Sequence, residues 1–218
     1  MRAITIKDSN KKINVGKIVC VGRNYAEHAQ ELGNEIPEKP VVFLKPASAL
    51  IYSGDSIIYP PFSEEMHHEA ELVLLIGKTI KDADKTESAN AIIGYGVGLD
   101  MTLRDIQSNL KKKGHPWTIA KGFDTSAVIS DFVSTDDFKL TLDEEIILSV
   151  NNNVRQKAKL KKMIFSPVYI VSYISSLMTL EEGDLIYTGT PAGVGLVAKG
   201  DKIHAEITGL ATLDCSVQ

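Results

Sequence analysis

Two acidic residues, Glu69 and Glu71, stand directly before an uninterrupted apolar run, Leu72 to Ile76. Such a run is typical of a strand that is buried on both faces. Because residues two apart on a strand project to the same side, the two carboxylates would crowd together at the edge of an apolar core. Burying such like charges is costly unless a cation offsets them. The pattern therefore predicts a bound metal ion or a cluster of Arg and Lys side chains, unless the start of the strand is simply exposed to solvent.

A third carboxylate, Asp100, follows a stretch from Gly94 to Leu99 in which glycine alternates with larger residues. This pattern indicates a strand that packs closely against other backbone, and the end of a strand is a favoured place for a ligand. An ordinary turn or cap residue is the alternative interpretation of Asp100. Three carboxylates without a thiol would suit a hard ion, Mg²⁺ or Mn²⁺ with Ca²⁺ also possible, and would leave coordination positions for water and substrate.

His28 and Glu31 lie three residues apart, a spacing that would place them on one face of a short helix. There Glu31 could orient the imidazole of His28 and raise its basicity, so that it removes a proton from a water molecule at neutral pH. Spacing alone favours a solvated helix face instead.

Several cationic, amide and hydroxyl side chains could bind the carboxylate and carbonyl oxygens of a 2-oxo acid. Arg104 and Gln107 lie three apart on the helix expected after Asp100, so they could face the same site. Lys121 could act as a catalytic group; we rank a Schiff base there below a charge-binding role, because a metal would already supply the electron sink. The full set of candidate substrate contacts is Arg23, Arg104, Gln107, Lys121 and Thr190.

Two further motifs carry less chemistry. The glycine-rich segment Gly189 to Gly195 lacks the Gly-Lys-Ser/Thr ending of a phosphate loop, so its glycines either let backbone N–H groups approach a substrate carboxylate or form a tight turn. Lys111 to Lys113 close a predicted helix just before Gly114, where cations complement the helix C-terminus, and we assign them no function. His68 at most supports a neighbouring group, and we assign no role to His67, His115 and His204.

Short strand patterns between turn signals dominate the chain, and Asn151-Asn152 predicts the turn of a hairpin. Capping patterns at Asp84–Glu87 and Thr102–Asp105 predict helix starts, and Ser166-Pro167 begins a helix that we expect to end near Gly183. Because strands do not alternate regularly with helices, we predict a mainly β fold of the α+β class with peripheral helices, not a doubly wound sheet. The predicted strands are residues 17–21, 41–45, 56–59, 70–76, 93–99, 146–150, 184–188 and 202–207.

The composition is that of an ordinary globular chain, with 44% hydrophobic and 24% charged residues among 218. The formal net charge of −4 argues against nucleic acid as a partner. Cys20 and Cys215 have no partners at zinc-ligand spacing, and we find neither a signal core nor a membrane span. We therefore expect one domain, residues 1–218, in a soluble cytoplasmic protein.

Six motifs in this order resemble the fumarylacetoacetate hydrolase superfamily, and in particular its small acylpyruvate hydrolases and oxaloacetate decarboxylases. The resemblance implies a mixed β-roll or β-sandwich catalytic domain of the fumarylacetoacetate hydrolase C-terminal type, and a homodimer. It also implies Mg²⁺ or Mn²⁺ on Glu69, Glu71 and Asp100, and a His28–Glu31 pair on a segment that closes over the ligand. The motifs are Gly22 to His28, Phe43 to Pro46, His68 to Leu72, Gly98 to Asp105, Lys121 to Asp124 and Tyr187 to Gly195.

The expected function is cleavage of a C–C bond in small 2-oxo acids through a metal-stabilised enolate, by acylpyruvate hydrolysis, oxaloacetate decarboxylation or both. One alternative is an isomerase, hydratase or decarboxylase of aromatic catabolism that acts on 2-hydroxymuconate-type 2-oxo diacids. Another is a non-catalytic, metal-dependent oxo acid binding protein, although retention of both His28 and Glu31 argues against it.

Overall fold

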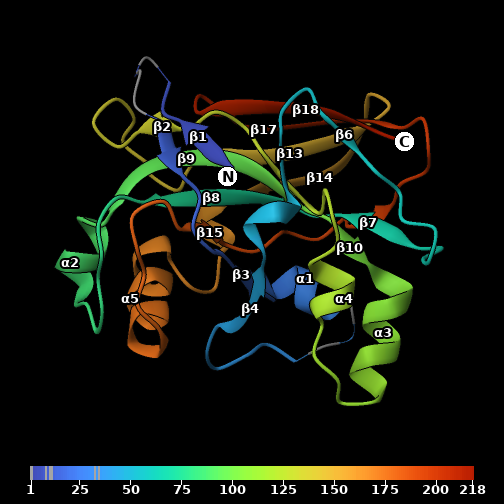
Figure 1. Ribbon diagram of the computed structural model, residues 1–218, viewed down its shortest axis with the longest axis horizontal. Coiled ribbons are helices and arrows are strands. Elements are labelled where there is room, and N and C mark those ends of the chain that lie inside the picture. Colours follow the sequence, from blue (N-terminus) through green and yellow to red (C-terminus); the bar gives the residue numbers. More distant parts are fainter. Residues whose placement is uncertain (1, 8, 10–11, 32, 34) are drawn as a thin grey trace.

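A sheet of eight strands forms the centre of the molecule (Figure 1). The computed structural model describes residues 2–7, 9, 12–31, 33 and 35–218. The strands are β3 (Ile18–Gly22), β4 (Val41–Lys45), β5 (Leu50–Tyr52), β8 (Ala70–Ile76), β9 (Ile92–Asp100), β11 (Ala127–Ile129), β12 (Val133–Ser134) and β15 (Leu185–Tyr187). Their order is β4-β3-β15-β8-β9-β11-β5, and β12 also pairs with β9. The pairs β3–β15 and β5–β11 are parallel, and the other pairs are antiparallel.

A second sheet of five strands lies over β8 and β9, at the top of Figure 1. It has the order β14-β13-β17-β18-β6, with β6 (Ser56–Ile57), β13 (Glu145–Val150), β14 (Asn153–Lys159), β17 (Lys202–Ile207) and β18 (Ala211–Val217). Two small sheets complete the strands. They are β1 (Ala3–Thr5) with β2 (Lys12–Asn14), and β10 (Thr102–Leu103) with β7 (Met66–His68) and β16 (Gly195–Leu196).

Strand β8 is buried along its whole length because apolar side chains cover both of its faces. Leu72 and Leu74 pack into a core cluster that includes apolar residues of β13 and β17. Val73 and Leu75 project to the other side and pack with residues of β3 and β15. Since Glu71 lies two residues before Val73, its side chain leaves the strand on this second side.

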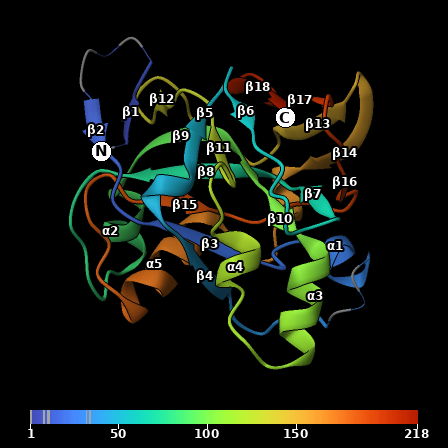
Figure 2. The ribbon, with the colours of Figure 1, turned by 45° about the vertical axis from the view of Figure 1, so that its right-hand side comes forward.

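The helices lie on the opposite side of the central sheet from the second sheet (Figure 1). In Figure 2, α1, α3 and α4 gather below β7 and β10, while α2 and α5 lie at the other end. None of the helices in the described part of the chain is long and apolar enough to cross a membrane. The helices are α1 (Ala26–Glu31), α2 (Lys85–Ala89), α3 (Arg104–Lys112), α4 (Thr118–Lys121) and α5 (Pro167–Leu177), with 3₁₀ turns at Ala47–Ala49 and Leu160–Lys162.

The two predicted capping boxes have different outcomes. At α2, the side chain of Asp84 accepts a hydrogen bond from the Glu87 N–H at 2.8 Å. The Glu87 carboxylate in turn accepts a hydrogen bond from the Asp84 N–H at 3.1 Å. The capping box at α2 is therefore confirmed. The box at Thr102 is wrong, because α3 begins at Arg104 and no side chain caps it. The Thr102 hydroxyl donates instead to the carbonyl of Asp100 at 3.2 Å.

The predictions of a helix at Ser166 and of a hairpin at Asn151-Asn152 hold, although the helix is shorter than expected, and the strand predicted at residues 56–59 already ends at Ile57. Ser166 caps α5 and Pro167 is its first residue, but the helix ends at Leu177, well before Gly183, because Met178 is already extended. Asn151 and Asn152 have φ values of 50° and 65° and connect β13 to β14, which confirms the hairpin. The fold is mainly β, as predicted from the strand pattern.

Candidate metal centre

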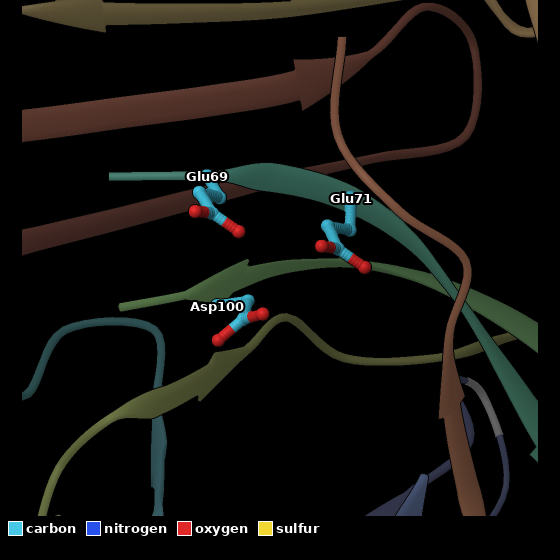
Figure 3. A group of neighbouring side chains, drawn as sticks. All are labelled: Glu69, Glu71 and Asp100. Carbon is cyan, nitrogen blue, oxygen red and sulfur yellow. The ribbon is translucent and has the colours of Figure 1, made fainter. Parts of the chain in front are cut away.

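Three carboxylates come together where β8 and β9 pair. Glu69, Glu71 and Asp100 each offer an oxygen atom, and these atoms lie within 4.8 Å of one another; Figure 3 shows the side chains converging. The strand ladder sets this arrangement, because the Asp100 N–H donates to the Glu69 carbonyl at 2.9 Å and Glu71 pairs with Gly98. The three residues are 5%, 1% and 1% exposed. The acids therefore lie together as expected, and their role as metal ligands stays a prediction.

Cationic side chains contact two of these acids. The Lys121 ammonium lies 2.9 Å from Glu69 Oε2 and donates to Asp100 Oδ2 at 2.6 Å, and the Arg104 guanidinium pairs with Glu69 Oε1 at 2.5 Å. The Lys45 ammonium forms an ion pair with Asp100 Oδ1 at 2.8 Å. The Arg and Lys cluster that the sequence left open as an alternative to a metal is thus present.

These ion pairs change the titration of the groups that make them. Burial would raise the pKa of the Glu69 carboxyl, but the Lys121 ammonium and the Arg104 guanidinium outweigh it and lower that pKa. Burial would lower the pKa of Lys121, but the carboxylates of Asp100 and Glu69 raise it above the ordinary value. Lys121 is therefore an ammonium at neutral pH, which argues against a Schiff base there.

Glu71 is the acid without a cationic partner among the described residues. Its Oε2 accepts a hydrogen bond from the Gly189 N–H at 2.6 Å. Burial, together with the negative charges of Asp100 and Glu69, raises the pKa of the Glu71 carboxyl well above its ordinary value. A divalent ion among the three carboxylates would remove this penalty, and an all-oxygen donor set suits Mg²⁺ or Mn²⁺. The residues present thus fit such an ion.

The predicted His28–Glu31 dyad is formed on α1. His28 Nδ1 lies 3.3 Å from Glu31 Oε2, and the Glu31 carboxylate also accepts the Gly193 N–H at 3.0 Å. Burial lowers the pKa of His28, and the nearby carboxylates of Glu69 and Glu31 oppose that effect only in part. The expectation that Glu31 makes His28 more basic thus describes one contribution, while burial decides the net direction. The imidazole is neutral at neutral pH, and a hydrogen bond from Nδ1 to Glu31 leaves Nε2 free to accept a proton.

Two amides of the glycine-rich segment, those of Gly189 and Gly193, bind acids of the site. Gly189 has φ +96°, and a Cβ there would lie 2.7 Å from the Cβ of Asn24. Gly193 also has φ +96°, and a Cβ there would lie 2.1 Å from the carbonyl oxygen of Arg155. Only glycine fits both positions. Their N–H groups donate to Glu71 and Glu31, so at these two residues the prediction of amides that approach a substrate carboxylate is wrong.

The predicted substrate contacts line one cavity, into which Glu69, Glu71 and His28 also face. Asp100 and Glu31 are not part of its wall. On α3, the Arg104 guanidinium donates to Gln107 Oε1 at 2.6 Å, which confirms that these residues share a helix face. The other expected contacts on the wall are Arg23, Lys121 and Thr190.

Two buried residues of this region were missed by the sequence reasoning. Lys45 is the last residue of the otherwise apolar strand β4, and a lysine at such a position is the signal that could have pointed to a buried ion pair. Gln156 is fully buried on β14, where its Oε1 accepts the Ala70 N–H at 3.0 Å and its Nε2 donates to Thr190 Oγ1 at 2.8 Å. It also lies 3.3 Å from His68 Nδ1. Gln156 therefore ties the start of β8 to the segment that carries Thr190.

The sequence and the fold have close counterparts among known proteins. Residues 17–218 match the family model described as fumarylacetoacetate (FAA) hydrolase C-terminal. A mitochondrial oxaloacetate tautomerase of Arabidopsis thaliana is 48% identical over 93% of this chain and 91% of its own. A mitochondrial oxaloacetate decarboxylase of Dictyostelium discoideum is 49% identical over 90% of both chains.

A solved structure with the same fold is the fumarylpyruvate hydrolase of Pseudomonas aeruginosa, in complex with Mn²⁺ and pyruvate. It is 38% identical to this chain, with a TM-score of 0.95, and the match covers 99% of this chain and 95% of the hydrolase.

Proposed function

Because this chain belongs to the fumarylacetoacetate hydrolase family, we propose that it is a divalent-metal-dependent enzyme that cleaves a C–C bond in small 2-oxo acids. The reactions are acylpyruvate hydrolysis, oxaloacetate decarboxylation or both, with pyruvate as the common product. One observation carries the proposal: three buried carboxylates, Glu69, Glu71 and Asp100, converge beside a cavity that His28 also lines.

The uncompensated charge of Glu71 supports a metal at this position. The other two acids have cationic partners, whereas Glu71 has a backbone N–H donor and two negative neighbours. The structural relative that holds Mn²⁺ and pyruvate supports the same class of ion and product. When bound, the ion would act as a Lewis acid on the 2-oxo group and offset negative charge that develops on its oxygen.

The residues on the cavity wall have distinct roles in this proposal. Arg104 and Gln107, coupled on one face of α3, bind and orient the carboxylate of the 2-oxo acid, with Thr190 as a further hydrogen-bonding group. Lys121 remains protonated and keeps Glu69 and Asp100 in place, and it can stabilise an oxyanion.

The dyad supplies the proton transfer. In hydrolysis, His28 Nε2 takes a proton from water while the water oxygen adds to the distal carbonyl of the acylpyruvate, and Glu31 stabilises the imidazolium that forms. The C–C bond then breaks, the acyl part leaves as a carboxylic acid, and pyruvate departs as an enolate that takes up a proton. In decarboxylation, carbon dioxide leaves without that water, so His28 is needed only to handle the proton.

Keto–enol tautomerisation of oxaloacetate is the second candidate, because the Arabidopsis relative that is 48% identical carries that name. This reaction breaks no C–C bond and moves one proton between carbon and oxygen. His28 is placed on the cavity wall and is neutral at neutral pH, so the same side chain suits this step.

A substrate panel tests the proposal. The purified protein is given Mg²⁺, Mn²⁺ or a chelator and is assayed with an acylpyruvate, fumarylpyruvate and oxaloacetate, with pyruvate formation and loss of the enol absorbance as separate signals. We expect metal-dependent pyruvate formation from at least one substrate, and its loss in Asp100→Asn. Glu64→Gln, which changes an exposed acid outside the cavity, is the matched control. Enol loss without pyruvate would favour the tautomerase, and neither signal above the metal-only rate would refute both candidates.

A further inference from the structure

The wall of the cavity carries two cations that the three carboxylates do not engage. Lys45, Lys121 and Arg104 are paired with Glu69 and Asp100. Arg23 and Lys111 also line the cavity, and neither has an ion-pair partner among the described residues.

Lys111 is held at a defined place by an aromatic contact. Its ammonium lies 5.2 Å from the centre of the Trp117 ring, and Trp117 meets Phe43 edge to face at 5.9 Å. The Lys121 ammonium lies 4.9 Å from the Phe43 ring. Phe43 and Trp117 therefore form an apolar wall between an inner ammonium beside the carboxylates and an outer ammonium at Lys111.

The spacing of residues along α3 also indicates a cavity with an inner cation near the carboxylates and an outer cation at Lys111. Arg104, Gln107 and Lys111 are three and then four residues apart, so they share the face of α3 that borders the cavity. At a rise of 1.5 Å per residue, Lys111 lies roughly 10 Å farther along the axis than Arg104, and its side chain leans back toward the helix start. In Figure 2, α3 runs away from β7 and β10, and Lys111 belongs to the last turn of this helix.

The charges at this outer end are not balanced by the protein itself. Burial, together with the positive charges of Arg23 and Arg104, lowers the pKa of Lys111 to about 8. Arg23 has φ +59°, a conformation that non-glycine residues rarely adopt, and its buried Nε has no hydrogen-bond partner. An anion bound between these side chains would relieve the repulsion and satisfy the free donors.

We propose that Lys111, supported by Trp117 and with Arg23 on the same wall, is a specificity residue that binds a second carboxylate at the distal end of the substrate. The substrates are then 2-oxo acids with a carboxylate at each end, joined by a short hydrocarbon bridge that lies against Phe43 and Trp117. This inference rests on the proposed function for the inner end of the cavity. The sequence analysis correctly placed Lys111 at the end of a helix, and the inference adds a role to this residue, to which no function was assigned.

The experiment compares matched ligands that differ only at the distal end. Binding of 2-oxoglutarate and of 2-oxopentanoate to the Mn²⁺-loaded protein is measured by calorimetry, together with the pair 2-oxoadipate and 2-oxohexanoate. The variants are Lys111→Met, which keeps an apolar stem against Trp117, Lys111→Arg, which keeps the charge, and Lys112→Met, which removes an equal charge from the exposed neighbouring position.

We expect the wild type to bind the dicarboxylic ligand of at least one pair about 10-fold or more tightly than the monocarboxylic ligand. One charge-assisted hydrogen bond to the distal carboxylate contributes a difference of this size. Lys111→Met should lose this preference, Lys111→Arg should keep most of it, and Lys112→Met should match the wild type. Equal binding of both ligands in each pair, or an equal loss in the Lys111→Met and Lys112→Met proteins, would overturn the inference.

The outcomes separate the two proposals. The protein could prefer dicarboxylic ligands through Lys111 and yet turn over no substrate of the panel. This result would support the distal carboxylate site and refute the proposed function. Turnover without the preference would keep the function and refute the distal site. A Mn²⁺-loaded protein that binds none of the four acids and turns over no substrate of the panel would refute both.

Discussion

Replacing Glu71 by Gln removes a buried negative charge while keeping the shape of the side chain and an oxygen that can accept the Gly189 N–H. Two unit charges 4.8 Å apart, the limit for the atoms of this site, repel by about 3 kcal/mol at an effective dielectric constant of about 20. We therefore expect metal-free Glu71→Gln protein to be more stable than metal-free wild type by about 3 kcal/mol near pH 8. Its metal affinity should fall by at least about 100-fold, because a charged ligand is lost.

The pH dependence gives this prediction a distinctive sign. The pKa of Glu71 is raised in the folded protein, so below its unfolded pKa of about 4.3 the carboxyl is protonated in both states and the variant should equal the wild type. As the pH rises further, the unfolded wild type releases this proton and the folded protein retains it. The advantage of the variant should then grow by at most about 1.4 kcal/mol per pH unit.

Glu69→Gln is the matched control with the opposite sign. Its carboxyl has a lowered pKa because Lys121 and Arg104 pair with it, so its contribution to stability is present above the unfolded pKa and is lost as the pH falls. Removing it leaves two buried cations without this partner, which should destabilise the metal-free protein by about 3–5 kcal/mol at neutral pH. Metal affinity should fall in both variants.

The assay is urea denaturation in the presence of a chelator from about pH 4 to 8, with calorimetric metal titration of the folded proteins. If Glu71→Gln destabilises the metal-free protein as much as Glu69→Gln does, Glu71 is not an uncompensated charge. If it binds Mn²⁺ as tightly as the wild type, it is not a ligand.

Three further predictions concern other parts of the site. His28→Ala should keep wild-type Mn²⁺ affinity and lower kcat for acylpyruvate hydrolysis by about 100-fold or more, and calorimetry with steady-state kinetics would contradict the assignment if metal affinity fell instead. Gln156→Leu should lose about 2–4 kcal/mol in urea denaturation, since it strands the Ala70 N–H and Thr190 hydroxyl that it now pairs; a change near zero would mean that water replaces it. Mn²⁺ affinity of the wild type should rise with pH above the ordinary range of a Glu carboxyl, because binding must displace the proton favoured on Glu71, and a pH-independent affinity in titration calorimetry would disprove that coupling.

Much of the strand pattern could be read from local sequence because burial leaves a direct signature there. Strands β4, β8 and β17 coincide with the predicted ranges, and the side of β8 to which Glu71 projects follows from the two-residue period alone. Strand β18 was missed, although its exposed Thr212 and Asp214 alternate with buried Leu213 and Cys215 as in a half-buried strand. The helix at Ser166 was recognised from its cap, while its end depended on tertiary packing that no local signal encodes.

The sequence was sufficient to predict the three acids of the candidate site and the helix face that carries Arg104 and Gln107. It was not sufficient to predict which cations pair with the acids. Glu69, Glu71 and Asp100 gather as their strand positions require. Lys45 comes from β4, which is separated from β9 by β3, β15 and β8 in the sheet order, so its pairing with Asp100 is a property of the assembled sheet. The same holds for Lys111, whose place on the cavity wall depends on Trp117. The homodimer, the single domain of residues 1–218 and the cytoplasmic location stay predictions.

Glu71 and Asp100 lie on two strands that have neighbours on both sides within the central sheet, and Glu69 directly precedes one of them, whereas α3 lies outside the sheet. Backbone amides of β8 and β9 can therefore exchange with deuterium only when much of the sheet opens, while the outer turns of α3 can adjust separately. Over evolutionary time, substitutions on the cavity-facing side of α3 can change which substrate binds, while the acids beside β8 and β9 keep their positions.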